Sequence, residues 1–179
     1  MSDSRITIRD EQPGDEAGIR RVHQAAFPTE LEGQLIDDLR RAGRLTSSWV
    51  AKYDDDIVGH IAFSPVTVGD NQRGLGLAPL AVRPERQRQG IGGALIRAGV
   101  AACRHRDAGF IVVLGDPAYY GRFGFQPASQ WQLADEYGGG DAFQALELIP
   151  GSIPAAGGLV RYSSEFAIFG PDDPNEPAH

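Results

Sequence analysis

The sequence predicts a mixed α/β (α+β) fold whose central sheet is mostly antiparallel and contains one central parallel βαβ unit. Apolar and alternating segments joined by short turns between residues 49 and 82 are typical of antiparallel hairpins. Apolar segments at 75–82 and 110–115 flank a helical pattern, which is typical of a βαβ unit. The 179 residues, 41% of them hydrophobic, suffice for one core. We expect a single domain over residues 1–169 and a disordered acidic, proline-rich tail over 170–179.

The first forty residues predict a strand and two helices. Residues 5–9 alternate between polar and apolar side chains, as a half-exposed strand does. A helical pattern follows and should end before Pro28, because a residue that precedes proline avoids the helical region. Leu31, Leu35 and Leu39 predict a second helix that stops near Gly43.

Two acids at the start of this second helix have two interpretations. Glu30 and Glu32 could line a site for a substrate amine, and Glu30 is our candidate for a catalytic base. Acids in a first helical turn more commonly stabilise the helix dipole. His60 is a further candidate base: it has the opposite parity from Ile61 and Phe63, which predicts a side chain that faces solvent or a site.

The chain centres on a glycine-rich turn between the strand at 75–82 and the helix that begins near Ile91. Glycines without side chains let a bound anion approach backbone N–H groups, and the start of a helix carries unpaired donors and a partial positive charge. Residues 83–106 contain six arginines and one acid, so this segment carries +5 while the rest of the chain carries −12. Such a local positive site favours an anionic cofactor over a long nucleic acid.

The turn has a recognisable motif. Residues 87–92, Gln-Arg-Gln-Gly-Ile-Gly, match Q/R-x-x-G-x-G/A, which resembles the acetyl-CoA pyrophosphate motif of the GNAT superfamily of N-acetyltransferases. A second segment follows the strand at 110–115 and contains Tyr119-Tyr120-x-x-x-Gly-Phe. It resembles the second GNAT signature, and the sequence of residues 113–120 is similar to that of the YhbS-like branch. The order of the two motifs within the expected structural context strengthens the resemblance.

The resemblance implies a GNAT-like sheet with helices on both faces and acetyl-CoA as co-substrate. It places Tyr120 as the general acid, also in contact with the cofactor. For Tyr119 we expect instead an aromatic packing residue with its hydroxyl at the surface. A backbone contact with the pantetheine is implied for Leu80, Ala81 and Val82. Pyrophosphate binding is implied for Gln87, Arg88, Gln89, Gly90, Ile91, Gly92, Gly93 and Ala94.

This resemblance implies transfer of an acetyl group to a primary amine of a small molecule, peptide or protein by direct attack in a ternary complex. The base stays open between Glu30, Glu32, His60 and a chain of waters. A non-catalytic acyl-CoA sensor on the same fold is the alternative, and a nucleotide-binding enzyme that uses the same βαβ site is a weaker one. A dispensable Tyr120 beside an intact phosphate motif would favour the sensor.

Composition narrows the partners. The acidic remainder of the chain favours a cationic acceptor over nucleic acid. The sequence contains no apolar run long enough to span a membrane and no signal peptide, so we expect a cytoplasmic protein without a membrane partner. Four scattered histidines and the single Cys103 predict no metal, and Cys103 should be a small buried apolar residue. A homodimer is expected only by analogy.

The last third of the chain gives weaker signals. We expect Phe123 and Phe125 in the core, Gly124 with a positive φ, and short strands near residues 131–133 and 145–148. Segments 158–162 and 165–169 could supply edge strands.

Overall fold

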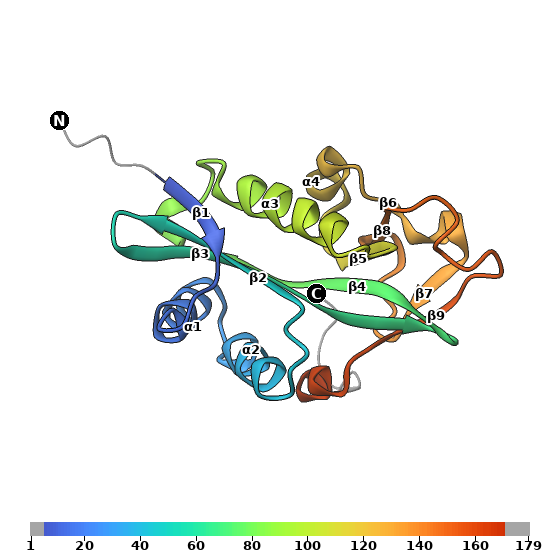
Figure 1. Cartoon of the computed structure of the whole chain (residues 1–179), viewed down its shortest axis with the longest axis horizontal. Helices are drawn as coiled ribbons and strands as arrows, with labels where there is room; N and C mark the ends of the chain where they lie inside the picture. Colours follow the sequence, from blue (N-terminus) through green and yellow to red (C-terminus); the bar gives the residue numbers. More distant parts are fainter. Residues whose placement is uncertain (1–5, 171–179) are drawn as a thin grey trace.

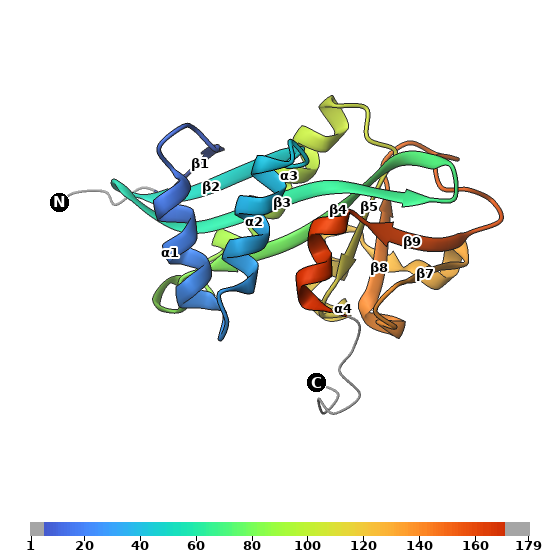
Figure 2. The same cartoon turned by 90° about the horizontal axis from the view of Figure 1, so that it is seen from below.

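The computed structural model describes residues 6–170, which form one sheet between two layers of helices. In Figure 1, α3 and α4 lie above the sheet, whereas α1, α2 and the red C-terminal segment lie below it. Figure 2, seen from below, shows these lower elements side by side across the strands. The predicted helices on both faces are therefore confirmed. The tail at 171–179 and residues 1–5 lie outside the described residues.

The first half of the chain builds the antiparallel part of the sheet. Its elements are β1 (Ile6–Asp10), α1 (Glu16–Ala26), α2 (Leu31–Arg41), β2 (Ser47–Tyr53), β3 (Asp56–Val68) and β4 (Asn71–Val82). Each of these strands pairs antiparallel with its neighbour, as the alternating patterns predict. The apolar stripe of α1 is buried against the sheet through Ile19 and Val22, together with Ile36 of α2. Leu35 and Leu39 of α2 are buried against Phe166.

The second half adds the parallel crossover. A single turn of 3-10 helix, η1 (Pro84–Arg86), leads into α3 (Ile91–His105), β5 (Phe110–Leu114), α4 (Pro117–Tyr120) and η2 (Gly121–Phe123). The remaining elements are β6 (Gln126–Pro127), η3 (Ala128–Trp131), β7 (Leu133–Asp135), η4 (Gly140–Ala142), β8 (Phe143–Glu147), β9 (Gly158–Tyr162) and η5 (Ser164–Phe169). Within the described chain the strand order is β1-β2-β3-β4-β5-β8-β6, with β9 joining β3 to β7.

The parallel pairing of β4 with β5 is short. It covers Gly74 to Gly76 of β4 against Phe110 to Val112 of β5 and then stops. β4 continues to Val82 along β3, and β5 continues along β8, so the two strands part. We call this divergence the split. Because the edge of β4 from Leu77 onward faces no strand on the β5 side among residues 6–170, its backbone groups can pair with an extended ligand.

Three expectations for the core require comment. Cys103 is fully buried, as predicted, and burial raises the pKa of its thiol to about 12. Gly124 has a φ of 91°, also as predicted. Segment 165–169, by contrast, is not an edge strand: it lies in the 3-10 helix η5, because Phe166 turns inward against Leu35 and Leu39 of α2.

Candidate active site

The glycine turn and the start of α3 form a cavity of about 580 Å³ on the upper face of the sheet. Its lining consists of Val82, Arg86, Gln87, Arg88, Gly90, Ile91, Gly92, Gly93, Arg97, Tyr119, Arg122 and Phe123, and we call this cavity the phosphate cradle. It combines backbone donors, guanidinium groups and one aromatic wall.

The backbone donors of the cradle come from the first turn of α3. Gly90 is the N-cap, and its left-handed φ of 82° is a conformation that favours glycine. The N–H of Ala94 donates to the Gly90 carbonyl at 3.0 Å, which closes the first helical hydrogen bond. The N–H groups of Ile91, Gly92 and Gly93 precede this bond and have no helical acceptor. They are thus the donors that an anion can reach, whereas the N–H of Ala94 is already used.

The loop ahead of α3 is held against the end of β4. The side-chain amide of Gln87 donates to the carbonyl of Val82 at 3.0 Å, and the N–H of Arg83 donates to Val58 of β3 at 2.9 Å. The guanidinium of Arg86 lies 3.6 Å from the centre of the Tyr53 ring. These contacts fix the turn before a ligand arrives, which lowers the entropy cost of binding.

Four arginines converge on the cradle from three segments. Arg86 and Arg88 come from the loop, Arg97 from α3 and Arg122 from η2. Sequence reasoning included only Arg88 among the binding residues. Arg97 lies two turns into a helix and Arg122 more than thirty residues beyond the motif, so only the folded chain brings them together.

Tyr119 packs against the core, as predicted, and in addition lines the cradle. A Cβ added at Gly92 would lie 2.6 Å from the Tyr119 hydroxyl, so the absence of a side chain at Gly92 leaves room for this group. Arg122 stacks over the Tyr119 ring at 4.7 Å from its centre. Phe123, expected in the core, is only half-buried and forms the aromatic wall of the cradle.

Tyr120 is buried at the carboxyl end of β5. Asp116 caps α4 by accepting a hydrogen bond from the Ala118 N–H at 2.9 Å, and this short helix turns Tyr120 inward. The ring packs over Gly115, where an added Cβ would lie 2.3 Å from the ring, and against Phe125 at 5.7 Å between centroids. Burial raises the pKa of the Tyr120 hydroxyl, so this group stays a protonated donor.

Several residues implied by the resemblance lie beside the cradle rather than in its lining. Leu80 packs in the core under α3, and Ala81 packs in the core under α1. The side chain of Gln89 donates to the Glu85 carbonyl at 3.3 Å. The residues that do line the cradle are Val82, Gln87, Arg88, Gly90, Ile91, Gly92 and Gly93.

The candidate bases lie elsewhere. Glu30 is the N-cap of α2, where its carboxylate accepts a hydrogen bond from Gln24 at 3.3 Å in a separate groove of about 260 Å³ between α1 and α2. It lines neither the cradle nor the pocket described below, and its role as a base stays a prediction. His60 is fully buried, which corrects the expectation of a solvent-facing side chain. Both of its ring nitrogens are engaged, by His23 at 2.8 Å and by Ser48 at 2.7 Å.

A second, apolar pocket lies at the split on the lower face of the sheet. Its volume is about 200 Å³, and its lining consists of Leu77, Ala78, Leu114, Tyr137, Tyr162, Phe166 and Phe169. We call it the aromatic pocket. Leu77 and Ala78 are the first residues of β4 beyond its pairing with β5, so this pocket opens directly at the split. Sequence reasoning missed it, because its four rings come from three separate segments.

The fold, the split and the cradle define a transferase of the acetyl-CoA type, and the comparison with family models agrees. The model described as the acetyltransferase (GNAT) family matches residues 16–125. The chain belongs to the GNAT family of N-acetyltransferases.

Within this family, the chain is similar to YhbS. It is 37% identical to the uncharacterized N-acetyltransferase YhbS of Escherichia coli K12, over 92% of this chain and 100% of that protein. The crystal structure of E. coli YhbS in complex with CoA has a TM-score of 0.89 and 36% identity, and covers 95% of this chain and 96% of that one. A GNAT acetyltransferase from Brucella melitensis in complex with acetyl-CoA has a TM-score of 0.78 and 41% identity, with 91% and 99% covered.

Among residues 6–170, no helix is long and apolar enough to cross a membrane. The same part of the chain contains no group of three His, Cys, Asp or Glu side chains placed to hold a metal ion.

Proposed function

We propose that the chain transfers the acetyl group of acetyl-CoA to a primary amine by direct attack in a ternary complex. The observation that carries this proposal is the phosphate cradle: three free N–H groups at a helix start, surrounded by four arginines, at the end of the strand that borders the split. Two similar proteins were crystallised with CoA or acetyl-CoA, which supports the same ligand here.

The spacing along β4 supports a shared site for cofactor and acceptor. Val82 lines the cradle and Ala78 lines the aromatic pocket, four residues away on one strand. At about 3.3 Å per residue this separation is about 13 Å. A pantetheine arm that runs along the open edge of β4 would therefore carry the thioester from the cradle toward the split.

The proposed reaction requires three proton transfers: one from the ammonium group before attack, one from the nitrogen once the C–N bond has formed, and one to the sulfur as the C–S bond breaks. The acceptor amine, with a typical pKa near 10.4, must lose a proton before its lone pair attacks the thioester carbon. The C–S bond then breaks and the sulfur leaves with the electron pair. Backbone N–H groups on the open edge of β4 can stabilise the oxyanion that forms before this step.

We propose Tyr120 as the general acid for the leaving sulfur. Its high pKa keeps the phenol protonated, so it can donate a hydrogen bond to the developing thiolate. Burial at the same place would also raise the pKa of the leaving thiol, which would favour transfer of the proton to the sulfur. Gly115 brings the ring to the carboxyl end of β5, which is one side of the split.

The proposal also places the acceptor among cationic amines and the protein in the cytoplasm. Homodimerisation stays a prediction by analogy.

The candidate base that the sequence suggests, Glu30, has a direct test, although its position outside both pockets speaks against this role. Replacement by Gln keeps the hydrogen-bonding capacity of the side chain and removes its charge. If the carboxylate takes the proton from the amine, kcat falls by about tenfold or more and the acidic limb of the kcat/KM profile disappears. Because Glu30 lies outside both pockets, we expect an unchanged profile, with stability reduced by a few tenths of a kcal/mol through the helix dipole.

The cradle is tested by calorimetric titration of acetyl-CoA into the wild type, Gly90→Asn and Gly90→Asp. Both substitutions tolerate the left-handed backbone, and they differ mainly in charge. We expect the Asp variant to bind at least about tenfold more weakly than the Asn variant, since a carboxylate would oppose the pyrophosphate. Equal affinity in both variants, or no binding by the folded wild type, would contradict the proposal.

A turnover assay separates the enzyme from a sensor. Release of free CoA in the presence of an amine, with mass spectrometry of the product, shows transfer. Tight binding of acetyl-CoA without transfer to any amine of a broad panel would identify the non-catalytic alternative.

A further inference from the structure

The aromatic pocket differs from its surroundings in containing four aromatic side chains within about 200 Å³. Tyr137 comes from the loop after β7, Tyr162 from β9, and Phe166 and Phe169 from η5. The rings of Tyr137 and Tyr162 lie 5.7 Å apart, those of Tyr162 and Phe166 5.0 Å, and those of Phe166 and Phe169 6.4 Å. They therefore form one continuous row, which suits a flat or branched apolar group.

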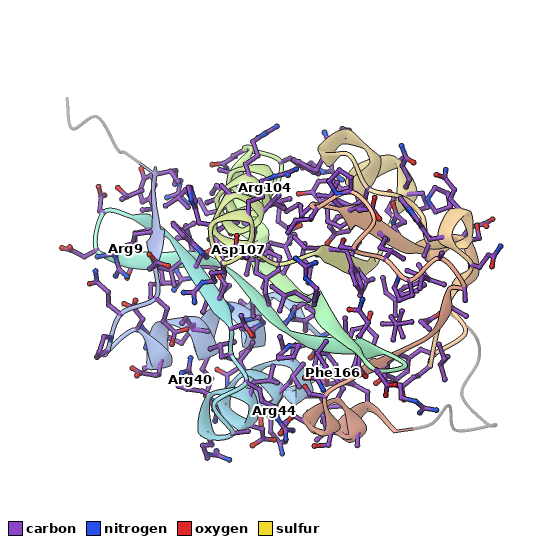
Figure 3. The ribbon with its side chains drawn as sticks, turned by 45° about the vertical axis from the view of Figure 1, so that its right-hand side comes forward. Arg9, Arg40, Arg44, Arg104, Asp107 and Phe166 are labelled. Atoms are coloured by element: carbon purple, nitrogen blue, oxygen red, sulfur yellow. The ribbon has the colours of Figure 1, made fainter. Side chains whose placement is uncertain are left out.

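One wall of the pocket, formed by η5, is held in place by contacts with α2 and with Arg44. Phe166 is only 5% exposed and packs against Leu35 and Leu39 of α2. Arg44 donates hydrogen bonds to Glu165 at 2.7 and 2.9 Å and to Ser164 at 3.0 Å, which ties η5 to the end of α2. Figure 3 labels Arg44 and Phe166 in the lower part of the molecule. A preformed wall of this kind lowers the ordering cost of a ligand.

Two carboxylates lie next to the pocket. Asp135 is 8% exposed and accepts hydrogen bonds from the N–H groups of Tyr137 at 3.0 Å and Gly139 at 2.8 Å. Glu136 accepts one from the N–H of Tyr162 at 2.8 Å. Burial and these two acids raise the pKa of both tyrosine hydroxyls. The exposed Arg161, 3.7 Å from Glu136, offsets part of the negative charge.

Ring faces beside carboxylates attract a cation, whereas an uncharged acyl chain would gain nothing from the acids. The apolar interior disfavours a buried charge and so favours the neutral amine deeper in the pocket. An incoming ammonium group would thus be attracted at the rim and meet the apolar wall at the split, where attack requires the neutral form.

We infer that the aromatic pocket binds the acceptor, and that this acceptor is a small primary amine bearing an aromatic or branched apolar group. The inference rests on the proposed acetyl transfer, since it assigns the acceptor of that reaction. It specifies a ligand class that the cradle, which serves any CoA thioester, leaves open.

The test compares 2-phenylethylamine with ethanolamine as acceptors at saturating acetyl-CoA. We expect kcat/KM to be at least tenfold higher for 2-phenylethylamine. The Phe169→Ala variant should raise the KM for 2-phenylethylamine about fivefold and leave the KM for acetyl-CoA unchanged. Leu159→Ala is the matched control: Leu159 is 40% exposed, against 39% for Phe169, and does not line the pocket.

The charge component has its own variants. Glu136→Gln can still accept the hydrogen bond from Tyr162 but removes the negative charge and frees Arg161. This variant should weaken the binding of 2-phenylethylamine two- to fivefold. It should leave the binding of 2-phenylethanol, the neutral isostere, unchanged. Asp70→Asn, in the turn between β3 and β4, removes an equal charge away from the pocket and should change neither. Equal effects of Glu136→Gln on the amine and on the alcohol would overturn the charge argument.

Other outcomes separate the pocket from the reaction. In one outcome, calorimetry shows that 2-phenylethylamine binds to the CoA-saturated chain and that Phe169→Ala weakens this binding, but no turnover is detected. That outcome would support the pocket and contradict the proposed function. Efficient acetylation of ethanolamine without a preference for 2-phenylethylamine would support the function and overturn the pocket. Preferential use of hexanoyl-CoA over acetyl-CoA that depends on Phe169 would also overturn it, because the pocket would then hold the acyl chain.

Discussion

The two pockets at the split differ in the physical means by which they can bind a ligand. The phosphate cradle on the α3 face presents backbone donors and four arginines, and suits an anion. The aromatic pocket on the α1 and α2 face presents apolar rings near two carboxylates, and suits an apolar cation. The sheet separates the two layers, and the open edge of β4 borders both pockets.

This separation of charge has a consequence for a ternary complex. A CoA thioester and a cationic amine would each be repelled from the other's pocket, so each substrate has one orientation in which both charges are satisfied. The thioester and the amine would then meet only at the split. Under the proposed function, the charge pattern would thus orient the two substrates without a conformational change.

The largest expected effect is on turnover and comes from replacing Tyr120, whose ring packs over Gly115 at the carboxyl end of β5. Tyr120→Phe should lower kcat by about 100-fold, because a phenyl ring cannot donate a proton to the leaving sulfur. The affinity for acetyl-CoA should change less than about threefold, since Tyr120 does not line the cradle. Rapid-mix kinetics with a thiol-reactive dye would measure the loss.

Tyr119→Phe is the matched control for this measurement. Tyr119 lies in the cradle, so its variant should raise the KM for acetyl-CoA and leave kcat nearly intact. A kcat loss in Tyr119→Phe that equals the loss in Tyr120→Phe would contradict the assignment of the acid. Because burial raises the pKa of Tyr120, this group should stay protonated between pH 8 and 10. Its ionisation should therefore not lower the wild-type kcat in this range.

The two pockets also differ in how far the sequence predicts them. The turn and first helical turn of the cradle lie within residues 82–93, so local spacing and glycine content locate them, and the family resemblance names their ligand. Arg97, Tyr119 and Arg122 complete the cradle only after folding. The aromatic pocket joins residues from 77 to 169, and the inward turn of Phe166 depends on packing against α2. Periodicity could not distinguish this segment from an edge strand, and for the same reason it could not reveal the pocket.

The second expected effect is a pH dependence of stability that comes from two buried histidines, His23 of α1 and His60 of β3. His23 on α1 is 1% exposed, and burial lowers its pKa to about 4 from an ordinary 6.5. His60 beside it is shifted in the same direction, first by burial and then by His23 and Arg40. The unfolded chain therefore binds more protons than the folded chain between about pH 6.5 and 4. The free energy of unfolding should fall as the pH falls through this window, by about 2 kcal/mol at pH 5 from His23 alone.

Urea denaturation at pH 7.5 and pH 5 measures this dependence. His23→Gln can still donate a hydrogen bond toward His60 and cannot titrate, so its stability should depend less on pH even where its stability at pH 7.5 is lower. A pH slope in the variant equal to that of the wild type would show that the buried pair is not the cause.

The smallest effect concerns the ion pair that holds the wall of the aromatic pocket. Arg44→Gln removes the charged partner of Glu165, and because the Arg44 side chain is 45% exposed, global stability should fall by less than about 1 kcal/mol. If η5 positions Phe166 and Phe169, the KM for the amine should nevertheless rise about threefold while the KM for acetyl-CoA stays unchanged. Arg41→Gln is the control, since Arg41 forms a similar pair with Asp38 three residues earlier on the same side of α2 and lines no part of the pocket. If Arg44→Gln raised the KM values for the amine and for acetyl-CoA equally, the two pockets would be mechanically coupled. Charge separation would then not be the only factor that orients the two substrates.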